Sequence, residues 1–226
     1  MVNRLRKRLG DHRDGGYSLT ELLVSMIIFG IVMGITFGIL ITITNQSKDT
    51  LARIRALEEA KLGISQIDRQ VRSGNVIMDP KYESDATAGV PKYYSMRIYT
   101  QAGAVPLCAQ WRVKDKNGDG YGDLEFRTWK PGPLDVQEWS AVAHNLVKMD
   151  FSGTTPSADR PEDWPPFWVD NSETAATQAQ FVRVTLRLRD PSEREGGKPT
   201  SVTTVITGRN TVFGYSQTLC ASAPTP

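Results

Sequence analysis

The hydrophobic pattern of the chain is dominated by one uninterrupted apolar stretch near the amino terminus. Residues 22–44 are 23 consecutive positions without a charged side chain. As a helix, this stretch is about 35 Å long, slightly more than the ~30 Å hydrocarbon core of a bilayer. The apolar core of a secretory signal peptide is shorter, about 7–15 residues, and ends at small residues. The pattern therefore predicts a transmembrane helix rather than a signal peptide.

After this stretch the pattern becomes that of an amphipathic helix. Apolar residues recur at steps of three and four, with charged residues between them. The apolar positions are Leu51, Ile54, Leu57, Ile64, Ile67 and Val71. Gly74 follows where a helix C-cap is expected. The sequence predicts one helix over about residues 19–73, its first half in lipid and its second half packed on a globular head.

Beyond residue 75 the pattern has the period of two that is typical of strands. The predicted strands cover residues 93–100, 109–113, 124–129, 147–151, 181–189 and 202–213. In the fifth, apolar side chains alternate with Arg183, Thr185, Arg187 and Arg189, which predicts a half-buried antiparallel strand with its arginines in solvent. The fold class is therefore α+β, a long N-terminal helix packed on an antiparallel β-sheet head.

Basic residues gather ahead of the apolar stretch. Residues 1–16 contain five basic and two acidic side chains. This excess keeps the amino terminus in the cytoplasm and places residues 45–226 on the other side of the membrane. Without residues 1–16 the chain keeps 22 basic and 23 acidic residues. So nearly neutral a chain has no basic footprint for binding nucleic acid.

One carboxylate, Glu21, stands at the start of the apolar stretch, five residues after a Gly-Gly pair. A charge at the edge of lipid is costly, so its presence indicates a partner charge supplied by another group. The simpler interpretation is that Glu21 marks the aqueous end of the helix.

The sequence Gly16, Tyr17-Ser18-Leu19-Thr20-Glu21, followed by the apolar helix, resembles the class III leader of type IV pilins and of type II secretion pseudopilins. The resemblance implies that a prepilin peptidase cuts after Gly16 and that Tyr17 becomes an N-methylated amino terminus. Tyrosine departs mildly from the family's usual phenylalanine at this position. The resemblance covers residues 1 to about 75.

The resemblance divides the chain into a leader (1–16), a helix (17–74, with 22–44 in the membrane) and an extracytoplasmic head (75–226). It implies a structural subunit without enzymatic activity, in which Glu21 compensates the terminal amine of a neighbouring subunit. Its expected partners are the peptidase, other pilin or pseudopilin subunits, the assembly platform, and membrane lipid before assembly. Residues 67–73 resemble the helix end of J-type minor subunits. The alternative is a membrane-anchored extracytoplasmic binding module that does not polymerise.

Glycines recur every four residues within the apolar stretch, at Gly30, Gly34 and Gly38. They share one helix face and form a small-xxx-small pattern that lets another helix approach closely. The alternative is that glycine is simply common in membrane helices. Gly38 also falls where many major pilins have a proline that kinks the helix.

One cluster in the head has the composition of a calcium loop. Asp115, Asn117, Asp119, Tyr121 and Asp123 alternate with other residues, and glycine is at the sixth position. The twelfth position is Phe126, where an EF-hand has glutamate, so an EF-hand is not expected. Calcium is the one cofactor that the sequence offers. A hairpin turn built from Asn-Gly and Asp-Gly explains the same residues.

Cys108 and Cys220 are the only cysteines. Outside the cytoplasm they form either a disulfide or two buried thiols. His144 is the only histidine beyond residue 12, so neither a metal cluster nor a hydrolytic triad can be assembled, and no catalytic residue is assigned. The aromatic residues of 164–168 are expected to cover the core, or else to contact another subunit.

Overall fold

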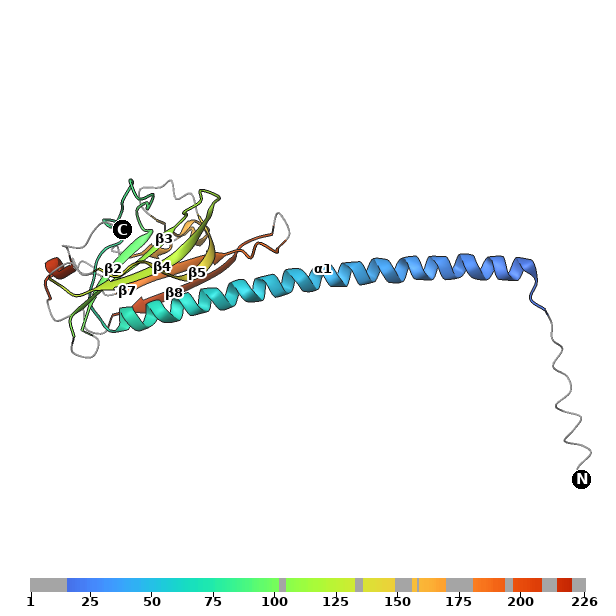
Figure 1. The fold of residues 1–226 in the computed structure, drawn as a ribbon, viewed down its shortest axis with the longest axis horizontal. Coiled ribbons are helices and arrows are strands. Elements are labelled where there is room, and N and C mark those ends of the chain that lie inside the picture. Colours follow the sequence, from blue (N-terminus) through green and yellow to red (C-terminus); the bar gives the residue numbers. More distant parts are fainter. Residues whose placement is uncertain are drawn as a thin grey trace, which may run out of the picture. The chain divides into compact units, whose positions relative to one another are not determined.

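The computed structural model describes residues 16–101, 105–132, 136–148, 156–157, 159–169, 181–193, 197–208 and 215–220. It contains one long helix, α1 (Leu19–Arg72), and an antiparallel sheet of eight strands. The predicted α+β class is therefore confirmed (Figure 1). The predicted leader, except Gly16, lies outside the described residues.

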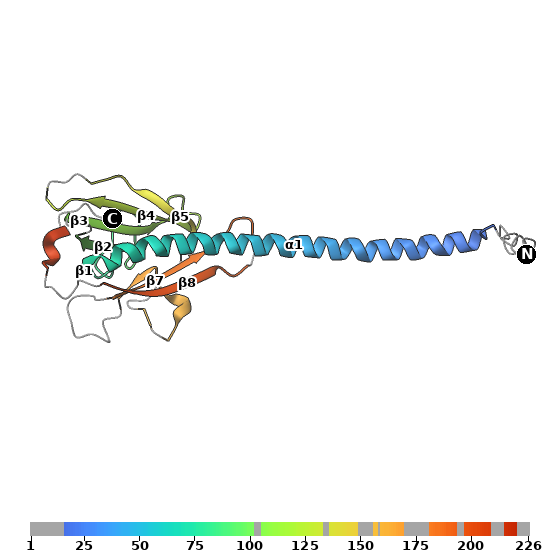
Figure 2. The same ribbon diagram turned by 90° about the horizontal axis from the view of Figure 1, so that it is seen from below.

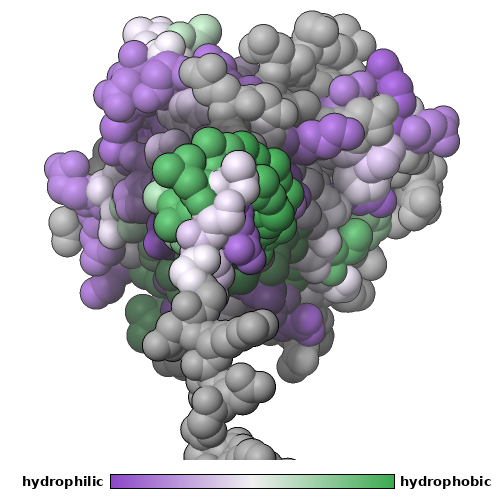
Figure 3. Space-filling model, turned by 90° about the vertical axis from the view of Figure 1, so that its right-hand side faces the viewer, coloured by the Kyte–Doolittle hydropathy of each residue, from purple (hydrophilic) through white to green (hydrophobic). Residues whose placement is uncertain are grey.

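The chain divides into two compact units, Met1–Ser47 and Lys48–Pro226. In the first unit, the side chains of α1 are exposed almost throughout, and Figure 3 shows apolar colour around the end of the helix. By length and composition, α1 can cross a membrane. Its hydroxyl groups donate to carbonyls one turn back in the same helix: Ser25 to Glu21, Thr36 to Val32, Thr42 to Gly38 and Thr44 to Leu40. These polar groups are therefore satisfied without water.

In the second unit, α1 lies across one face of the sheet (Figure 2). Its buried positions are mostly small residues: Ala52, Ala56, Ala60, Gly63, Ile67 and Val71. The predicted apolar face is thus right at Ile67 and Val71 but wrong at Leu51 and Ile54, which are 50% and 45% exposed. The reason is close packing, since a Cβ atom on Gly63 would lie 2.8 Å from Leu124 Cδ2.

The strands follow the helix along the chain, joined in the order β1-β2-β3-β4-β5-β7-β6, with β8 paired to β7. Their bounds are β1 (Gly74–Ile77), β2 (Ser95–Thr100), β3 (Leu107–Lys114), β4 (Tyr121–Trp129), β5 (Ser140–Val147), β6 (Phe167–Trp168), β7 (Phe181–Leu188) and β8 (Thr200–Thr207). β5 pairs with β4 but meets β7 only at Leu146 and Leu188.

Several strands differ from the sequence prediction. A strand was expected at 202–213, but β8 ends at Thr207, and residues 209–214 lie outside the described part of the chain. A strand was expected at 147–151, but β5 ends at Val147, and residues 149–151 lie outside the described part of the chain. β6 is only two residues long, too short for a pattern to indicate. β1 begins at Gly74, which is therefore not a C-cap. Glycine is needed there for space, because a Cβ atom would lie 2.9 Å from both Ile98 Cγ2 and the Val71 carbonyl oxygen.

The arginine-rich face of β7 is covered rather than solvated, which corrects the prediction for this strand. Arg187 is 8% exposed, and its Nη2 donates to the Pro161 carbonyl at 2.7 Å. The Arg183 guanidinium lies 4.1 Å from the centre of the Trp164 ring. Phe167 and Trp168 are buried, so the aromatic residues cover the sheet, as expected.

Candidate functional site

The predicted cleavage junction precedes α1 and is open to its surroundings. Tyr17 is 82% exposed. A Cβ atom on Gly16 would meet no heavy atom within 4 Å. The fold of the described residues therefore does not require glycine at position 16. A requirement for glycine at position 16 would come from an enzyme that binds and cuts the junction.

Glu21 lies in the first turn of α1. Its backbone N–H, like that of Leu22, donates to the carbonyl of Ser18, at 3.0 and 3.2 Å respectively. A carboxylate in this turn is favoured by the partial positive charge at the helix amino terminus. Glu21 is exposed, and within the described residues no cation lies within 4.0 Å of its carboxylate. It is therefore accessible to a charge on another chain.

Gly30, Gly34 and Gly38 are exposed positions of α1. A Cβ atom on any of them would find nothing within 4 Å. Packing among the described residues thus gives no reason for these glycines, and the surface they leave is smooth and open to a second helix.

The 115–123 cluster covers the turn between β3 and β4, residues 115–120, and the first three residues of β4. Asp115 Oδ1 accepts N–H groups from Asn117 and Gly118 at 3.2 and 2.7 Å, and its Oδ2 accepts Gly120 N–H at 3.0 Å. These hydrogen bonds hold the pKa of Asp115 below its usual value, although desolvation opposes them. Gly118 and Gly120 have φ angles of 72° and 86°, which glycine adopts without strain. The turn chemistry therefore accounts for these residues.

The other carboxylates of the cluster point to separate partners. Asp119 Oδ1 accepts the N–H of Tyr121 at 2.9 Å. Asp123 lies 2.9 Å from His144 Nδ1 and 3.8 Å from Lys116 Nζ. Among the described residues, no group of three or more His, Cys, Asp or Glu side chains is arranged to hold a metal ion.

We expect calcium to leave the melting temperature of the detergent-solubilised protein unchanged, because the Asp115 carboxylate already accepts three N–H groups. A site with calcium at a hundred times its Kd would stabilise the fold by about 2.7 kcal/mol, which a thermal melt resolves easily. The test compares the melting temperature of the protein in calcium, in magnesium and in chelator. A rise specific to calcium that is lost in Asp119→Asn would show that the loop binds the ion.

Cys108 and Cys220 form a disulfide with their Cα atoms 5.8 Å apart. It ties the short helix η6 (Gln217–Cys220) to β3, on the sheet face opposite α1. The disulfide lies in a second small core with Val76, Tyr99 and Trp129.

Beside this core is a layer of buried ion pairs that sequence reasoning missed. Arg97 pairs with Glu83 at 3.1 Å, and Arg112 with Glu125 at 2.7 Å. Arg127 Nη2 donates to Gln110 Oε1 at 2.6 Å. Desolvation, with the nearby charges of Arg112 and Arg97, lowers the pKa of Arg127 to about 10, so it is still charged at neutral pH. The sequence signal that could have indicated this layer is the alternation of its polar residues with apolar ones along β2, β3 and β4.

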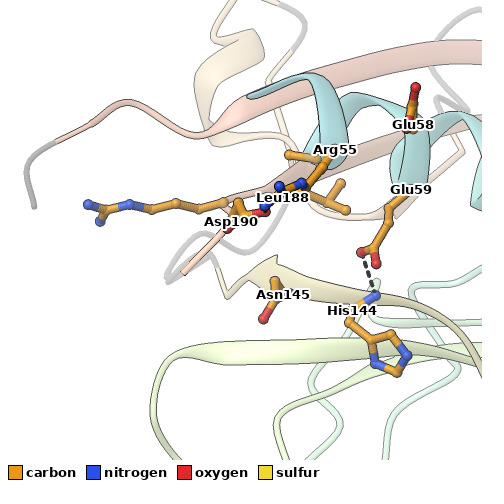
Figure 4. A pocket seen from close by; sticks show the side chains of 9 residues that line it. Arg55, Glu58, Glu59, His144, Asn145, Leu188 and Asp190 are labelled. Carbon is orange, nitrogen blue, oxygen red and sulfur yellow. Dashed lines mark hydrogen bonds and ion pairs between the residues drawn. The ribbon is translucent and has the colours of Figure 1, made fainter. Parts of the chain in front are cut away.

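A cavity of about 260 Å³ lies in the second unit, between α1, β5 and the end of β7 (Figure 4). Its carboxylates have partners nearby. Glu59 Oε2 accepts the backbone N–H of His144 at 3.1 Å, and Asp190 Oδ2 lies 3.9 Å from Arg55 Nη1. His144 Nδ1 lies 2.9 Å from Asp123 Oδ1, and within the described residues no hydroxyl or thiol is hydrogen-bonded to His144.

Comparison with known families identifies the amino-terminal region. Residues 11–37 match the prokaryotic N-terminal methylation motif. The match spans the predicted cleavage junction, Glu21 and residues 22–37 of the apolar stretch, so the chain carries the class III leader of type IV prepilins and pseudopilins, and that prediction is confirmed. Searches of curated proteins and of solved structures gave no match.

Proposed function

We propose that the protein is a prepilin-like structural subunit that is cut after Gly16, N-methylated at Tyr17 and assembled through α1 into a type IV pilus or pseudopilus. The methylation motif over residues 11–37 carries this proposal. The geometry supports it, because the junction, Glu21 and the glycine face are all accessible on an apolar helix with no partner among the described residues.

The expected topology has residues 1–16 in the cytoplasm and the head outside. The basic leader favours this orientation. A disulfide in the head supports it independently, because disulfides persist in oxidising compartments. Lipid surrounds the apolar half of α1 before assembly, and other subunits replace lipid afterwards. The machinery that acts on this subunit comprises a prepilin peptidase and an assembly platform.

We assign the subunit to the minor components of such a filament. The support is family analogy: the head is larger than many major pilins carry, and residues 67–73 resemble the helix end of J-type subunits. The alternative function, an anchored binding module, draws support only from the cavity in Figure 4. Its expected aromatic contact surface is largely buried.

Processing distinguishes the two functions. We expect the protein extracted from its native membrane to begin at N-methylated Tyr17, because the peptidase removes residues 1–16. Intact-mass measurement reads this directly. Gly16→Val is expected to keep all 226 residues and the same melting temperature, since a side chain at position 16 meets no neighbour. Wild-type protein that begins at Met1 would instead support the anchored module.

A further inference from the structure

Arg97 joins three segments that are far apart in the sequence. It lies in β2 on the face opposite α1 and is 7% exposed. Its Nη1 donates to the carbonyl oxygen of Cys220 at 2.7 Å, and its Nη2 lies 3.1 Å from Glu83 Oε2. The guanidinium also lies 5.9 Å from the centre of the Trp129 ring. One buried cation thus binds the carboxy-terminal segment to the sheet.

The group that Arg97 binds belongs to one of the two bridged cysteines. The other, Cys108, is opposite Tyr99 in the β2–β3 ladder, and Tyr99 is two residues from Arg97 on the same face. Arg97 therefore fixes the backbone of Cys220 close to the strand position from which the Cys108 sulfur projects.

Arg97 aside, the described polar contacts between residues 215–220 and the sheet are 3.3 Å or longer, while Leu219 packs against the small core around the disulfide. The Tyr215 hydroxyl donates to Gln101 Oε1 at 3.3 Å near the surface, and the Tyr215 ring lies 5.9 Å from that of Tyr99. A buried hydrogen bond from a charged donor is stronger than either of these contacts.

The two cysteines are 112 residues apart, so closing the disulfide costs chain entropy. The entropy lost on bringing two chain positions together grows with their separation. A contact that docks the segment in the reduced protein lowers this cost and raises the effective concentration of one thiol at the other.

We propose that Arg97 is a positioning residue for disulfide formation, docking residues 215–220 so that Cys108 and Cys220 meet. The oxidant is a disulfide, either a small molecule or an oxidoreductase of the compartment. One cysteine thiolate attacks it and forms a mixed disulfide, releasing one thiol. The second cysteine thiolate then displaces the other. The protein loses two electrons and two protons, and the oxidant leaves as two thiols.

Glu83 completes the arrangement by supplying the countercharge. Burial raises the pKa of Glu83, and the charge of Arg97 opposes that rise. Because Glu83 Oε2 lies 3.1 Å from Arg97 Nη2, it holds the guanidinium in the orientation in which Nη1 reaches the Cys220 carbonyl oxygen. This inference concerns the head alone and holds for a filament subunit or an anchored module.

The test measures the equilibrium between the reduced and bridged forms of the full chain in detergent, using glutathione buffers, alkylation and mass analysis. Arg97→Met should lower the effective thiol concentration about tenfold, as expected for losing a charge-assisted hydrogen bond. The matched control is Arg112→Met, which removes an equally buried arginine that pairs with Glu125 rather than with the segment. Arg112→Met should change the effective thiol concentration by less than about twofold, which is the ordinary effect of a substitution away from the site.

A second variant guards against general loss of structure. Arg97→Lys keeps the charge but loses the planar guanidinium that reaches two partners at once. Its effective thiol concentration should therefore lie between those of wild type and Arg97→Met. Arg97 does not position the cysteines if the effective thiol concentration of Arg97→Met equals that of wild type, or if it falls no further than that of Arg112→Met. If neither methionine variant folds, Arg97→Lys decides, and a value equal to wild type overturns the proposal.

Discussion

Glu21→Gln is expected to be cut and methylated normally yet to be missing from filaments. On the proposed function, cleavage after Gly16 would create an α-amino cation at Tyr17, and the Glu21 carboxylate would compensate this charge on a neighbouring subunit. Glutamine keeps the shape of the side chain but removes the charge. Leaving a buried cation without its partner costs about 3–5 kcal/mol, so incorporation should fall a hundredfold or more.

The measurement is the fraction of subunit in sheared filaments against that in membranes, with intact mass to verify the cut. Glu58→Gln is the matched control, because Glu58 is an exposed glutamate of the same helix in its head-proximal half. It should assemble as wild type does. Normal incorporation of Glu21→Gln would mean that Glu21 only marks the end of the membrane span.

Gly63→Leu, in the part of α1 that packs on the sheet, is expected to destabilise the second unit strongly. A Cβ atom at this position lies 2.8 Å from Leu124 Cδ2 and 3.2 Å from Leu186 Cδ1, and the rest of a leucine side chain has no room. Overpacking of this kind typically lowers the free energy of unfolding by about 1–3 kcal/mol. Here α1 must move off the sheet, so the upper end of that range is expected.

Denaturant unfolding followed by tryptophan fluorescence reports the change, since Trp111 lies in the same core. Leu62→Ala alters the next residue, which is 52% exposed, and should change stability by no more than about 0.5 kcal/mol. Equal stability of Gly63→Leu and wild type would show that the helix does not pack as closely as described.

The long helix and the amino-terminal site could be predicted because both depend on local properties. A charge-free span of 23 residues determines where the chain meets lipid. The methylation motif is a short linear segment, residues 11–37, so its residues are adjacent in the sequence. Neither feature requires knowing what the head packs against.

The covered polar face of the sheet could not be predicted, because what covers it comes from distant segments. The alternating pattern of β7 indicates that Arg187 is solvated, but in the structure its guanidinium donates to the carbonyl oxygen of Pro161. Arg97 likewise needs Glu83 and Cys220 to make its burial favourable. Alternation shows that two faces differ, but not that both are buried.

The hydroxyl groups of α1 bear on how the helix changes surroundings. Thr36, Thr42 and Thr44 each donate to the carbonyl four residues earlier, so none needs a partner from lipid or from another chain. A helix of this kind can pass between a bilayer and a bundle of helices with these hydrogen bonds unchanged. Only van der Waals contacts and the charge at Glu21 differ between the two environments. If the protein assembles as proposed, a subunit that left the filament would therefore return to the membrane with these hydrogen bonds intact.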